Sequence, residues 1–472
     1  MFKKNEEISI LIDDLGNEGE GIGHIDGFPF FIKGTVPGDR VRAKVMKVKK
    51  NLGFARLISV LSPSENRIEP ECPVSGKCGG CSLQHVSREE ELRYKDRKVF
   101  NCLKRIGGIP EEALLKAKEP VEGAEDPFRY RNKAQYPVGR GNDGKAAAGF
   151  YSGRSHRITE NEDCLLSPPE FGEILRLVLD HIDENKISVY DEEEGTGLIR
   201  HVFIRKGFGT GEIMVCLVST SFDIPYSDKL AEKLMAFPGV VSVMVDLNPD
   251  KTNVILGSET KCLAGKPYIE DILCGLRFRI SPLSFYQVNP VIAEKLYLKA
   301  MEYAGLKGDD SGPAPKEIWD ICCGIGTIAL TAASLSPSSK VMGVEISPEA
   351  IGDAKVNADI NGLKNAEFFA APAETFLPEY YSSHPEASPE VVIADPPRKG
   401  LDKEVLDTLI SLSPERIVYI SCDPATLARD LKILLSSGYD LKKYRVFDQF
   451  SRTGHVEVVV MLSRAEGEAG AL

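Results

Sequence analysis

Apolar residues in the second half of the chain occur in short runs, separated by longer stretches with helical spacing. Runs of this kind lie at 319–321, 340–344, 391–394 and 416–421. Alternation of buried strands with helices is typical of a parallel sheet covered by helices on both faces. We therefore predict a doubly wound α/β domain over 281–465, with a Gly-, Asp- and Pro-rich linker at 307–316 before its first strand.

The first 68 residues have a different pattern. Short alternating segments at 8–12 and 42–48 flank a glycine-punctuated stretch. Short strands with many glycine turns are typical of a small barrel of the oligonucleotide-binding kind. The sequence thus predicts a small β-barrel over 1–68.

Between these two parts the pattern is mixed. Helical spacing at 175–187 and apolar runs at 213–218 and 240–245 predict a helix and two buried strands. We expect a central α+β domain over 69–280, with a helix around 88–106 that packs on the C-terminal domain. The tail 466–472 is expected to be disordered.

Composition changes this picture little. The chain has 472 residues, of which 42% are hydrophobic and 27% charged, as in an ordinary globular protein. It has no apolar run of about 18 residues and no signal-peptide pattern, so we expect a cytoplasmic protein without a membrane span.

The net charge of −12 argues weakly against a nucleic-acid partner, but binding needs only a local basic face. Two basic stretches supply residues for one: Arg93, Lys95, Arg97 and Lys98, then Arg129, Arg131, Lys133 and Arg140.

Four cysteines form a candidate metal site. Cys72, Cys78 and Cys81 follow a C-x5-C-x2-C spacing, and Cys164 lies far downstream. Four thiolates suit zinc or an iron–sulfur cluster. Because zinc knuckles usually carry two C-x2-C pairs and this chain has one, the spacing favours a four-iron, four-sulfur cluster. The alternative is that Cys164 is a buried apolar residue and the site is incomplete.

A candidate nucleotide site follows the first strand of the α/β domain. Residues 319–327 predict a strand that runs into a turn containing Gly324 and Gly326, and Glu345 ends the next strand. A carboxylate there can accept hydrogen bonds from both ribose hydroxyls of a nucleoside. Ala329 stands where a third glycine of a dinucleotide fingerprint would be, which favours S-adenosylmethionine over NAD.

Three further residues lie where strands of this domain begin or end. Asp395 follows 391–394 and precedes two prolines, Cys422 follows 416–421, and Glu457 opens the last strand. Pro424 starts a helix directly after Cys422, and a helix N-terminus favours the thiolate. A cysteine at a strand end is more often a packing residue, but two neighbouring acids point to catalysis. Addition of a thiolate to carbon 6 of uracil makes carbon 5 nucleophilic, and a carboxylate can then remove the carbon 5 proton.

Taken together, these motifs resemble the RNA uridine-5 methyltransferase family, which acts on 23S ribosomal RNA or transfer RNA. Residues 14–21 and 36–39 look like a TRAM domain, an RNA-binding barrel. Residues 197–201 and 285–289 match further family signatures. The chain is similar to the family over nearly its whole length, but Cys322 and Ser451 stand where the family usually has an aromatic residue and a proline.

The resemblance implies a Rossmann-like S-adenosylmethionine methyltransferase domain, preceded by a TRAM barrel and a central iron–sulfur domain with an RNA-binding surface. It implies catalytic roles for Cys422 as nucleophile, Glu457 as proton acceptor, and Asp395. The implied cofactor contacts are Gln287, Cys322, Gly324, Gly326, Glu345 and Asp395. The implied RNA contacts are Phe285, Arg131 and Lys133, and the implied cluster ligands are Cys72, Cys78, Cys81 and Cys164.

We therefore expect a monomeric enzyme that methylates carbon 5 of uridine in RNA, with 23S ribosomal RNA as the favoured substrate and transfer RNA as the alternative. A non-catalytic RNA-binding iron–sulfur protein would not need Cys422 and Glu457. An enzyme that methylates amino groups would need an aromatic residue after the two prolines, where Arg398 stands.

Overall fold

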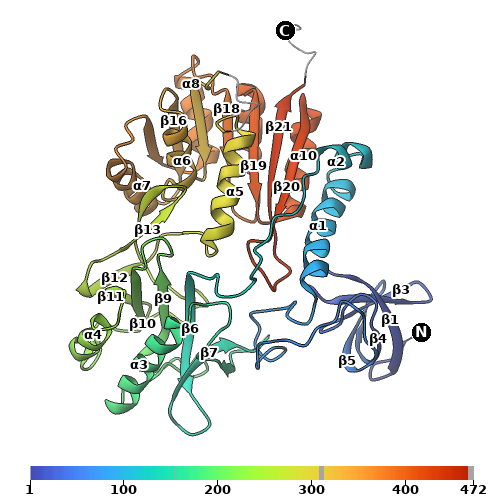
Figure 1. Cartoon of the computed structure of the whole chain (residues 1–472), viewed down its shortest axis with the longest axis vertical. Coiled ribbons are helices and arrows are strands. Elements are labelled where there is room, and N and C mark those ends of the chain that lie inside the picture. The colour runs from blue at the N-terminus through green and yellow to red at the C-terminus, as the bar shows by residue number, and fades with distance from the viewer. Residues whose placement is uncertain (1, 154, 308–312, 466–472) are drawn as a thin grey trace.

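The computed structural model describes residues 2–153, 155–307 and 313–465, which form three bodies (Figure 1). The first is a closed barrel with strand order β1-β2-β3-β5-β4. Alternation along β1 places Ile8, Ile10 and Ile12 inside it. The predicted N-terminal barrel is therefore confirmed. Its strands are β1 (Glu7–Leu15), β2 (Gly21–Ile25), β3 (Phe28–Ile32), β4 (Arg40–Val48) and β5 (Gly53–Ser62).

The second body is a mixed sheet with strand order β12-β11-β10-β9-β6-β7-β8, beside which α3 and α4 lie (Figure 1). Its elements are β6 (Lys133–Arg140), β7 (Ala146–Tyr151), β8 (Ile158–Glu160), α3 (Glu170–Glu184), β9 (Ile199–Lys206), β10 (Ile213–Ser219), α4 (Ser227–Met235), β11 (Val240–Leu247) and β12 (Glu259–Gly265). Helix α3 begins and ends earlier than predicted. Its buried stripe already starts at Phe171, and Lys186 has a φ of 52° that ends the helical conformation.

The third body is the predicted doubly wound α/β domain, with strand order β17-β16-β15-β18-β19-β21-β20. The strands from β17 to β19 are parallel, whereas β21 and β20 are antiparallel to their neighbours. Its elements are α5 (Pro290–Tyr303), β15 (Glu317–Ile321), α6 (Thr327–Leu335), β16 (Lys340–Glu345), α7 (Pro348–Ile360), β17 (Ala366–Ala370), α8 (Ala373–Ser383), β18 (Val391–Ala394), α9 (Lys403–Leu412), β19 (Arg416–Ser421), α10 (Pro424–Ser436), β20 (Tyr439–Phe447) and β21 (Glu457–Arg464).

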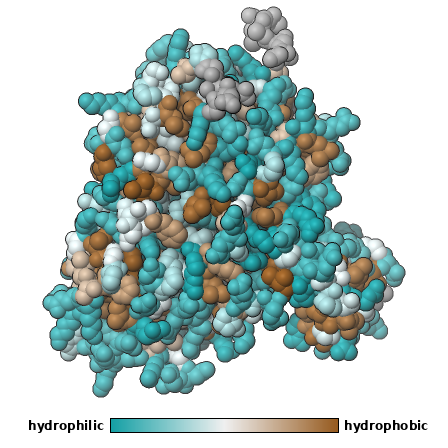
Figure 2. Space-filling view, in the orientation of Figure 1, coloured by the Kyte–Doolittle hydropathy of each residue, from teal (hydrophilic) through white to brown (hydrophobic). Residues whose placement is uncertain are grey.

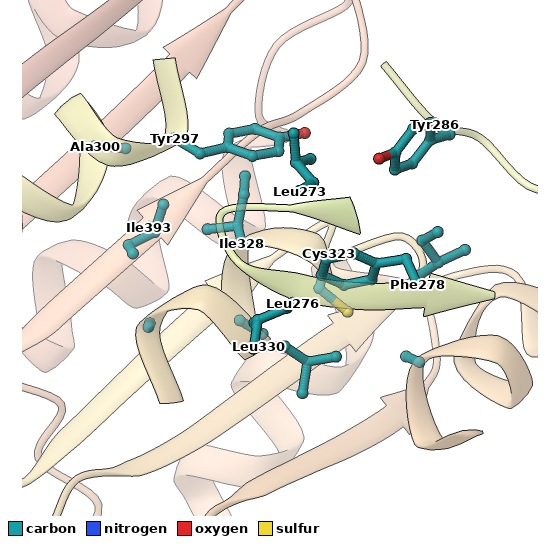
Figure 3. Packing of buried hydrophobic residues seen from close by; sticks show 14 of the residues in the cluster. Leu273, Leu276, Phe278, Tyr286, Tyr297, Ala300, Cys323, Ile328, Leu330 and Ile393 are labelled. Atoms are coloured by element: carbon teal, nitrogen blue, oxygen red, sulfur yellow. The ribbon is translucent and has the colours of Figure 1, made fainter. Parts of the chain in front are cut away.

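A small hairpin closes one side of this domain. It consists of β13 (Ile269–Leu273) and β14 (Leu276–Ile280), which pair antiparallel. Figure 3 shows Leu276 and Phe278 of the hairpin against Leu330 and Cys323 of the domain below it. Cys323 is therefore a packing residue of the core.

Helix α1 (Arg88–Arg105), followed by α2 (Glu111–Ala117), links the barrel to the C-terminal domain. Ser87 caps α1 by accepting a hydrogen bond from the Glu90 N–H. Val99 and Leu103 of α1 are buried in one apolar cluster with Leu427 and Leu431 of α10. The helix expected around 88–106 thus forms and packs on the C-terminal domain.

The visible face of the molecule is mostly hydrophilic, with small scattered hydrophobic patches (Figure 2). Within the residues that the structure describes, no helix is both long and apolar enough to cross a membrane. The predicted tail 466–472 and part of the predicted linker, 308–312, lie outside those residues.

The core of the C-terminal domain is tightly packed around Gly343. A Cβ on Gly343 would lie 2.6 Å from Phe368 and 2.9 Å from the Cys323 sulfur. Gly343→Ala should therefore lower the free energy of unfolding of this domain by about 1–3 kcal/mol, because it overpacks the core. Gly352 lies on the exposed face of α7, where a Cβ meets nothing within 4 Å.

As the matched control, Gly352→Ala should raise the free energy of unfolding by about 0.5–1 kcal/mol, because alanine is the better helix former. Calorimetric or urea unfolding of the two variants gives both values. Equal stability of the two variants would contradict this packing.

Candidate active site

A cavity of about 1010 Å³ opens where the parallel strands end. Residues after β15, β16, β18 and β19 line it, because the carboxyl ends of parallel strands meet at one edge of the sheet. Glu457, at the start of the antiparallel β21, lies at the same edge. The cavity lining includes these residues proposed from the sequence: Phe285, Gln287, Cys322, Gly324, Glu345, Asp395, Cys422 and Glu457.

The turn after β15 has an unusual backbone. Cys322 has a φ of 66° and Gly324 a φ of 53°, in the left-handed region that glycine adopts most easily. The Gly324 N–H donates to Glu345 Oε2 at 3.2 Å, and the Ser347 N–H donates to Glu345 Oε1 at 3.1 Å. The turn and the carboxylate at the end of β16 therefore hold each other in place on one wall of the cavity.

Gly326 does not line the cavity. It lies directly before α6 with a φ of 84°, and a Cβ there would lie 3.1 Å from Phe368 and 3.2 Å from Ala354. Glycine is therefore required there by backbone conformation and packing. The structure gives Gly326 no direct place beside a cofactor.

Gln287 of the cavity lining is buried and is fixed by two hydrogen bonds. Asn132 Nδ2 donates to its backbone carbonyl at 2.9 Å, and Gln449 Nε2 donates to its side-chain Oε1 at 3.1 Å. Its neighbour Phe285 is 65% exposed at the rim. An exposed aromatic ring at the mouth of a cavity offers a flat apolar surface to a ring-shaped ligand.

Two carboxyl groups face the cavity from β18 and β21. Burial raises the pKa of Asp395 to about 7. Burial and then the charge of Asp395 raise the pKa of Glu457 well above its usual range, although Arg398 opposes this. Glu457 is almost fully buried, and its Oε2 has no hydrogen-bond partner among the described residues. Near neutral pH, the pair therefore holds at least one proton.

Cys422 follows β19 and is half-buried. Its thiol pKa is raised to about 11 by burial, then by the charges of Glu457 and Asp395, and is lowered by Arg398. Burial and the two acids therefore outweigh any gain that the helix N-terminus gives the thiolate. The Asp423 carboxylate caps α10 by accepting hydrogen bonds from the Ala425 and Thr426 N–H groups.

Among the further residues that line the cavity without having been assigned to it from the sequence are Arg398, Phe450 and His455. Arg398 is exposed and, in the described part of the chain, forms no ion pair. It directly follows the Asp-Pro-Pro turn, so the strand-end argument that found Asp395 applies to it as well. Phe450 belongs to a loop without apolar periodicity, which gives no comparable signal.

The four cysteines gather between the barrel and the central sheet. All are half-buried and free, and the charges of Cys164 and Cys72 add to burial in raising the pKa of Cys78. Burial raises the pKa of Cys81 to about 12, and Arg131 opposes this. Among the described residues, however, no group of three or more His, Cys, Asp or Glu side chains could hold a metal ion as it stands.

Arg131 and Lys133 do not line the cavity. Arg131 lies near the cysteines, and burial followed by the charges of Arg205 and Arg131 lowers the pKa of Lys133 to about 7. Between them, the Asn132 N–H donates to the Val288 carbonyl at 2.9 Å. The two basic residues therefore flank Asn132, whose side chain and backbone hold Gln287 and Val288.

The chain is similar to known proteins over almost its full length. The family described as tRNA (Uracil-5-)-methyltransferase matches residues 257–465, and the TRAM domain matches residues 2–58. A protein of Clostridium acetobutylicum named as an uncharacterized RNA methyltransferase is 44% identical over 98% of each chain. One of Clostridium tetani with the same description is 42% identical over 98% of this chain and 97% of its own. The chain belongs to the RNA uracil-5 methyltransferase family.

A solved structure supports the same conclusion for this RNA uracil-5 methyltransferase. The tRNA (uracil-54, C5)-methyltransferase of Pyrococcus abyssi, in complex with S-adenosyl-L-homocysteine, is 27% identical. It has a TM-score of 0.75 and covers 96% of this chain and 99% of its own. The barrel, the central sheet and the methyltransferase domain thus occur together in a solved relative.

The acidity of Cys422 in the free enzyme is a testable consequence of this geometry. The rate of its alkylation by iodoacetamide should rise with pH. The pH at the midpoint of this rise should lie well above the ordinary thiol pKa of 9.0, because burial and two acids disfavour the thiolate. Glu457→Gln should lower that midpoint, and Arg398→Gln should raise it.

Mass spectrometry of the peptide containing Cys422 separates its reaction from that of the other cysteines. Cys216, which is fully buried, provides an internal control that should not react in the folded enzyme. A midpoint at or below 9 in the wild type would contradict the charge arrangement described here.

Proposed function

We propose that this enzyme methylates carbon 5 of uridine in 23S ribosomal RNA through a covalent bond between Cys422 and carbon 6 of the base. The observation that carries the proposal is the single cavity lined by Cys422, Glu457, Asp395 and the residues expected to bind the cofactor. A non-catalytic RNA-binding protein has no need for a thiol, a half-buried acid and a buried acid in one cavity.

The cavity residues in the turn after β15 and at the end of β16 fit S-adenosylmethionine. Glu345 can accept hydrogen bonds from the two ribose hydroxyls, and its own orientation is fixed by the Gly324 and Ser347 N–H groups. A Cβ on Gly324 would meet nothing within 4 Å, so the backbone of this turn is open to close approach. Cys322 replaces the usual aromatic residue beside the adenosine, which leaves contact there to its backbone and short side chain.

Cys422 starts the reaction by giving its thiol proton to solvent and bonding through the thiolate to carbon 6, which gives carbon 5 the electron density to attack a methyl group. S-adenosylmethionine supplies that methyl group, and its positive sulfonium favours the Cys422 thiolate. Glu457 then removes the proton from carbon 5, and the carbon–sulfur bond breaks to release Cys422 and the methylated base. The base reaches Cys422 only after it has left its stack, and Phe285 at the rim is placed to stack on it.

The acid pair explains how a buried Glu457 can act as a base. Burial raises the pKa of both acids, and the charge of Asp395 adds to this at Glu457, so the pair shares protons in the free enzyme. Glu457 acts as the base in the state in which a shared proton lies on Asp395. We assign Asp395 this role together with support of the cofactor or the target base.

Arg131 and Lys133 are proposed to contact RNA phosphates outside the cavity. In the described residues neither has a carboxylate partner, and both lie on the segment that supports Gln287. A cation without a protein partner is available to a phosphate. Lysine with a lowered pKa would regain its charge beside such an anion.

The four cysteines fit an iron–sulfur cluster better than a zinc ion. Four thiolates suit either group, but zinc knuckles usually carry two C-x2-C pairs and this chain has one. Cys72, Cys78, Cys81 and Cys164 would hold it, with the Gly80 N–H directed at the Cys78 sulfur at 3.4 Å.

Transfer RNA is the second candidate substrate. The solved relative from Pyrococcus abyssi is named as a tRNA enzyme and matches 96% of this chain. The cysteine site and the barrel favour ribosomal RNA, because transfer-RNA enzymes of this family often lack both, but the match to that relative spans almost all of this chain. The same methylation assay with each RNA therefore decides between them.

Two active-site variants test the covalent mechanism. Cys422→Ala should lower the rate of methyl transfer at least about a thousandfold, because the nucleophile is gone. S-adenosylmethionine should still bind, because Glu345 and the turn at Gly324 are intact. Glu457→Gln should form the covalent enzyme–RNA complex and release it slowly. Methyl transfer by both variants is measured with ribosomal and transfer RNA from cells lacking the enzyme. RNA mass mapping identifies the methylated uridine.

Methyl transfer by Cys422→Ala at the wild-type rate would remove the covalent mechanism. Methylation of transfer RNA but not of ribosomal RNA would show that transfer RNA is the substrate.

Anaerobic purification tests the cluster. The protein should be brown, with about four iron and four sulfide ions per chain, and Cys81→Ser should lower the iron content. Cys262→Ser is the matched control, because Cys262 is also half-buried and free but lies on β12, away from the four cysteines. A colourless protein with a single zinc ion would refute the iron assignment.

A further inference from the structure

The loop that precedes Glu457 connects most parts of the molecule. It comprises residues 448–456, between β20 and β21, and we call it the junction loop. Phe450 and His455 of this loop line the cavity, and Gln449 donates to the Gln287 side chain at 3.1 Å. The position of the junction loop therefore affects the place where Glu457 enters the cavity.

Glu91 on α1 holds this loop at Arg452. The Glu91 side chain is fully buried, and its Oε1 accepts a hydrogen bond from the Arg452 backbone N–H at 2.6 Å. Its Oε2 faces the Arg452 guanidinium at 3.4 Å and the Arg88 guanidinium at 3.2 Å. A charged acceptor on a backbone N–H fixes that residue of the loop more firmly than a neutral one.

Further charges complete a buried network around Glu91. Lys95 Nζ lies 3.2 Å from Glu91 Oε1, donates to the Phe450 carbonyl at 3.0 Å and pairs with Asp448. Arg88 pairs with Asp448 at 2.5 Å. Burying such a network costs desolvation energy, so its net gain in stability is small. Its directed contacts instead fix one conformation of the junction loop.

The barrel and the cysteine segment contact the same loop. The Ser82 and Leu83 N–H groups, directly after Cys81, donate to the Arg452 carbonyl at 3.1 and 3.0 Å. Lys98 of α1 donates to the Asn17 carbonyl of the barrel at 2.9 Å and to the Gly454 carbonyl at 2.8 Å. Ser451, which stands in place of the family's proline, donates to Asp448 at 2.6 Å, so a side-chain bond shapes the loop there.

We propose that Glu91 is a positioning residue for the proton-removal step, and that it acts by holding the junction loop through Arg452. Glu91 touches neither the RNA base nor the cofactor, because it does not line the cavity. Loss of its charge weakens the hold on the Arg452 backbone N–H, although the Arg452 carbonyl and the Val86 carbonyl keep their hydrogen bonds. A small shift of the loop then displaces Glu457. This inference rests on the proposed covalent mechanism.

RNA with 5-fluorouridine at the target position separates this step from the earlier ones. Cys422 adds to carbon 6 and carbon 5 takes the methyl group as before. Carbon 5 then carries fluorine and methyl but no proton, so Glu457 has nothing to remove and the carbon–sulfur bond persists. The yield of this trapped complex reports Cys422 addition and methyl transfer without the Glu457 step.

Glu91→Gln should lower kcat on ordinary RNA about 10- to 100-fold, because small displacements of a catalytic group have effects of this size. Its KM and its rate of trapping by fluorinated RNA should stay within about twofold of the wild type. Asp96→Asn is the matched control: Asp96 lies on the same helix, is partly buried and pairs with Lys118, away from the junction loop. It should leave all three quantities unchanged.

A second variant keeps the test decisive if Glu91→Gln folds poorly. Glu91→Leu with Arg452→Leu removes the hold on the loop without leaving an unpaired buried charge, and it should show the same selective loss of kcat. A wild-type kcat in either variant would overturn the inference. So would equal losses of trapping and methylation. Absence of trapping in the wild type would instead overturn the covalent mechanism itself.

Discussion

Three acidic groups in one poorly solvated cavity determine the chemistry of this enzyme. Cys422, Asp395 and Glu457 all have pKa values above their ordinary range, and burial is the first cause for each. Each ionised member disfavours ionisation of the others, so protons are shared among them. Arg398 is the cation that opposes this effect at Cys422 and Glu457. The free enzyme thus holds a protonated thiol, which in the proposed mechanism becomes a nucleophile when positive charge and substrate arrive.

The second requirement is a fixed geometry around these acids. The parallel sheet supplies Asp395 and Cys422 at neighbouring strand ends, whereas Glu457 depends on an irregular loop. That loop is held by α1, by the segment after Cys81 and, through Lys98, by the barrel. The parts that bind RNA and the part that performs the chemistry therefore share one structural support.

Much of this could be predicted from the sequence, because the strand ends are encoded locally. Apolar runs ending in a single polar residue identified Asp395 and Cys422, and the fold class followed from their alternation with helices. The thiol pKa could not be predicted in this way, because the burial of Cys422 and its closeness to Glu457 and Asp395 are properties of the folded chain. The contact between Glu91 and Arg452 joins residues far apart in sequence, and neither lies in a motif. Gly326 fitted the motif, but its role is packing.

The central claim is that carbon 5 loses its proton in the same cycle in which it gains a methyl group. RNA that carries tritium on carbon 5 of the target uridine tests this most directly. We predict that one tritium enters the water for each methyl group transferred from S-adenosylmethionine. Methyl transfer that leaves the tritium in the RNA would place the modification at another atom and would contradict the account.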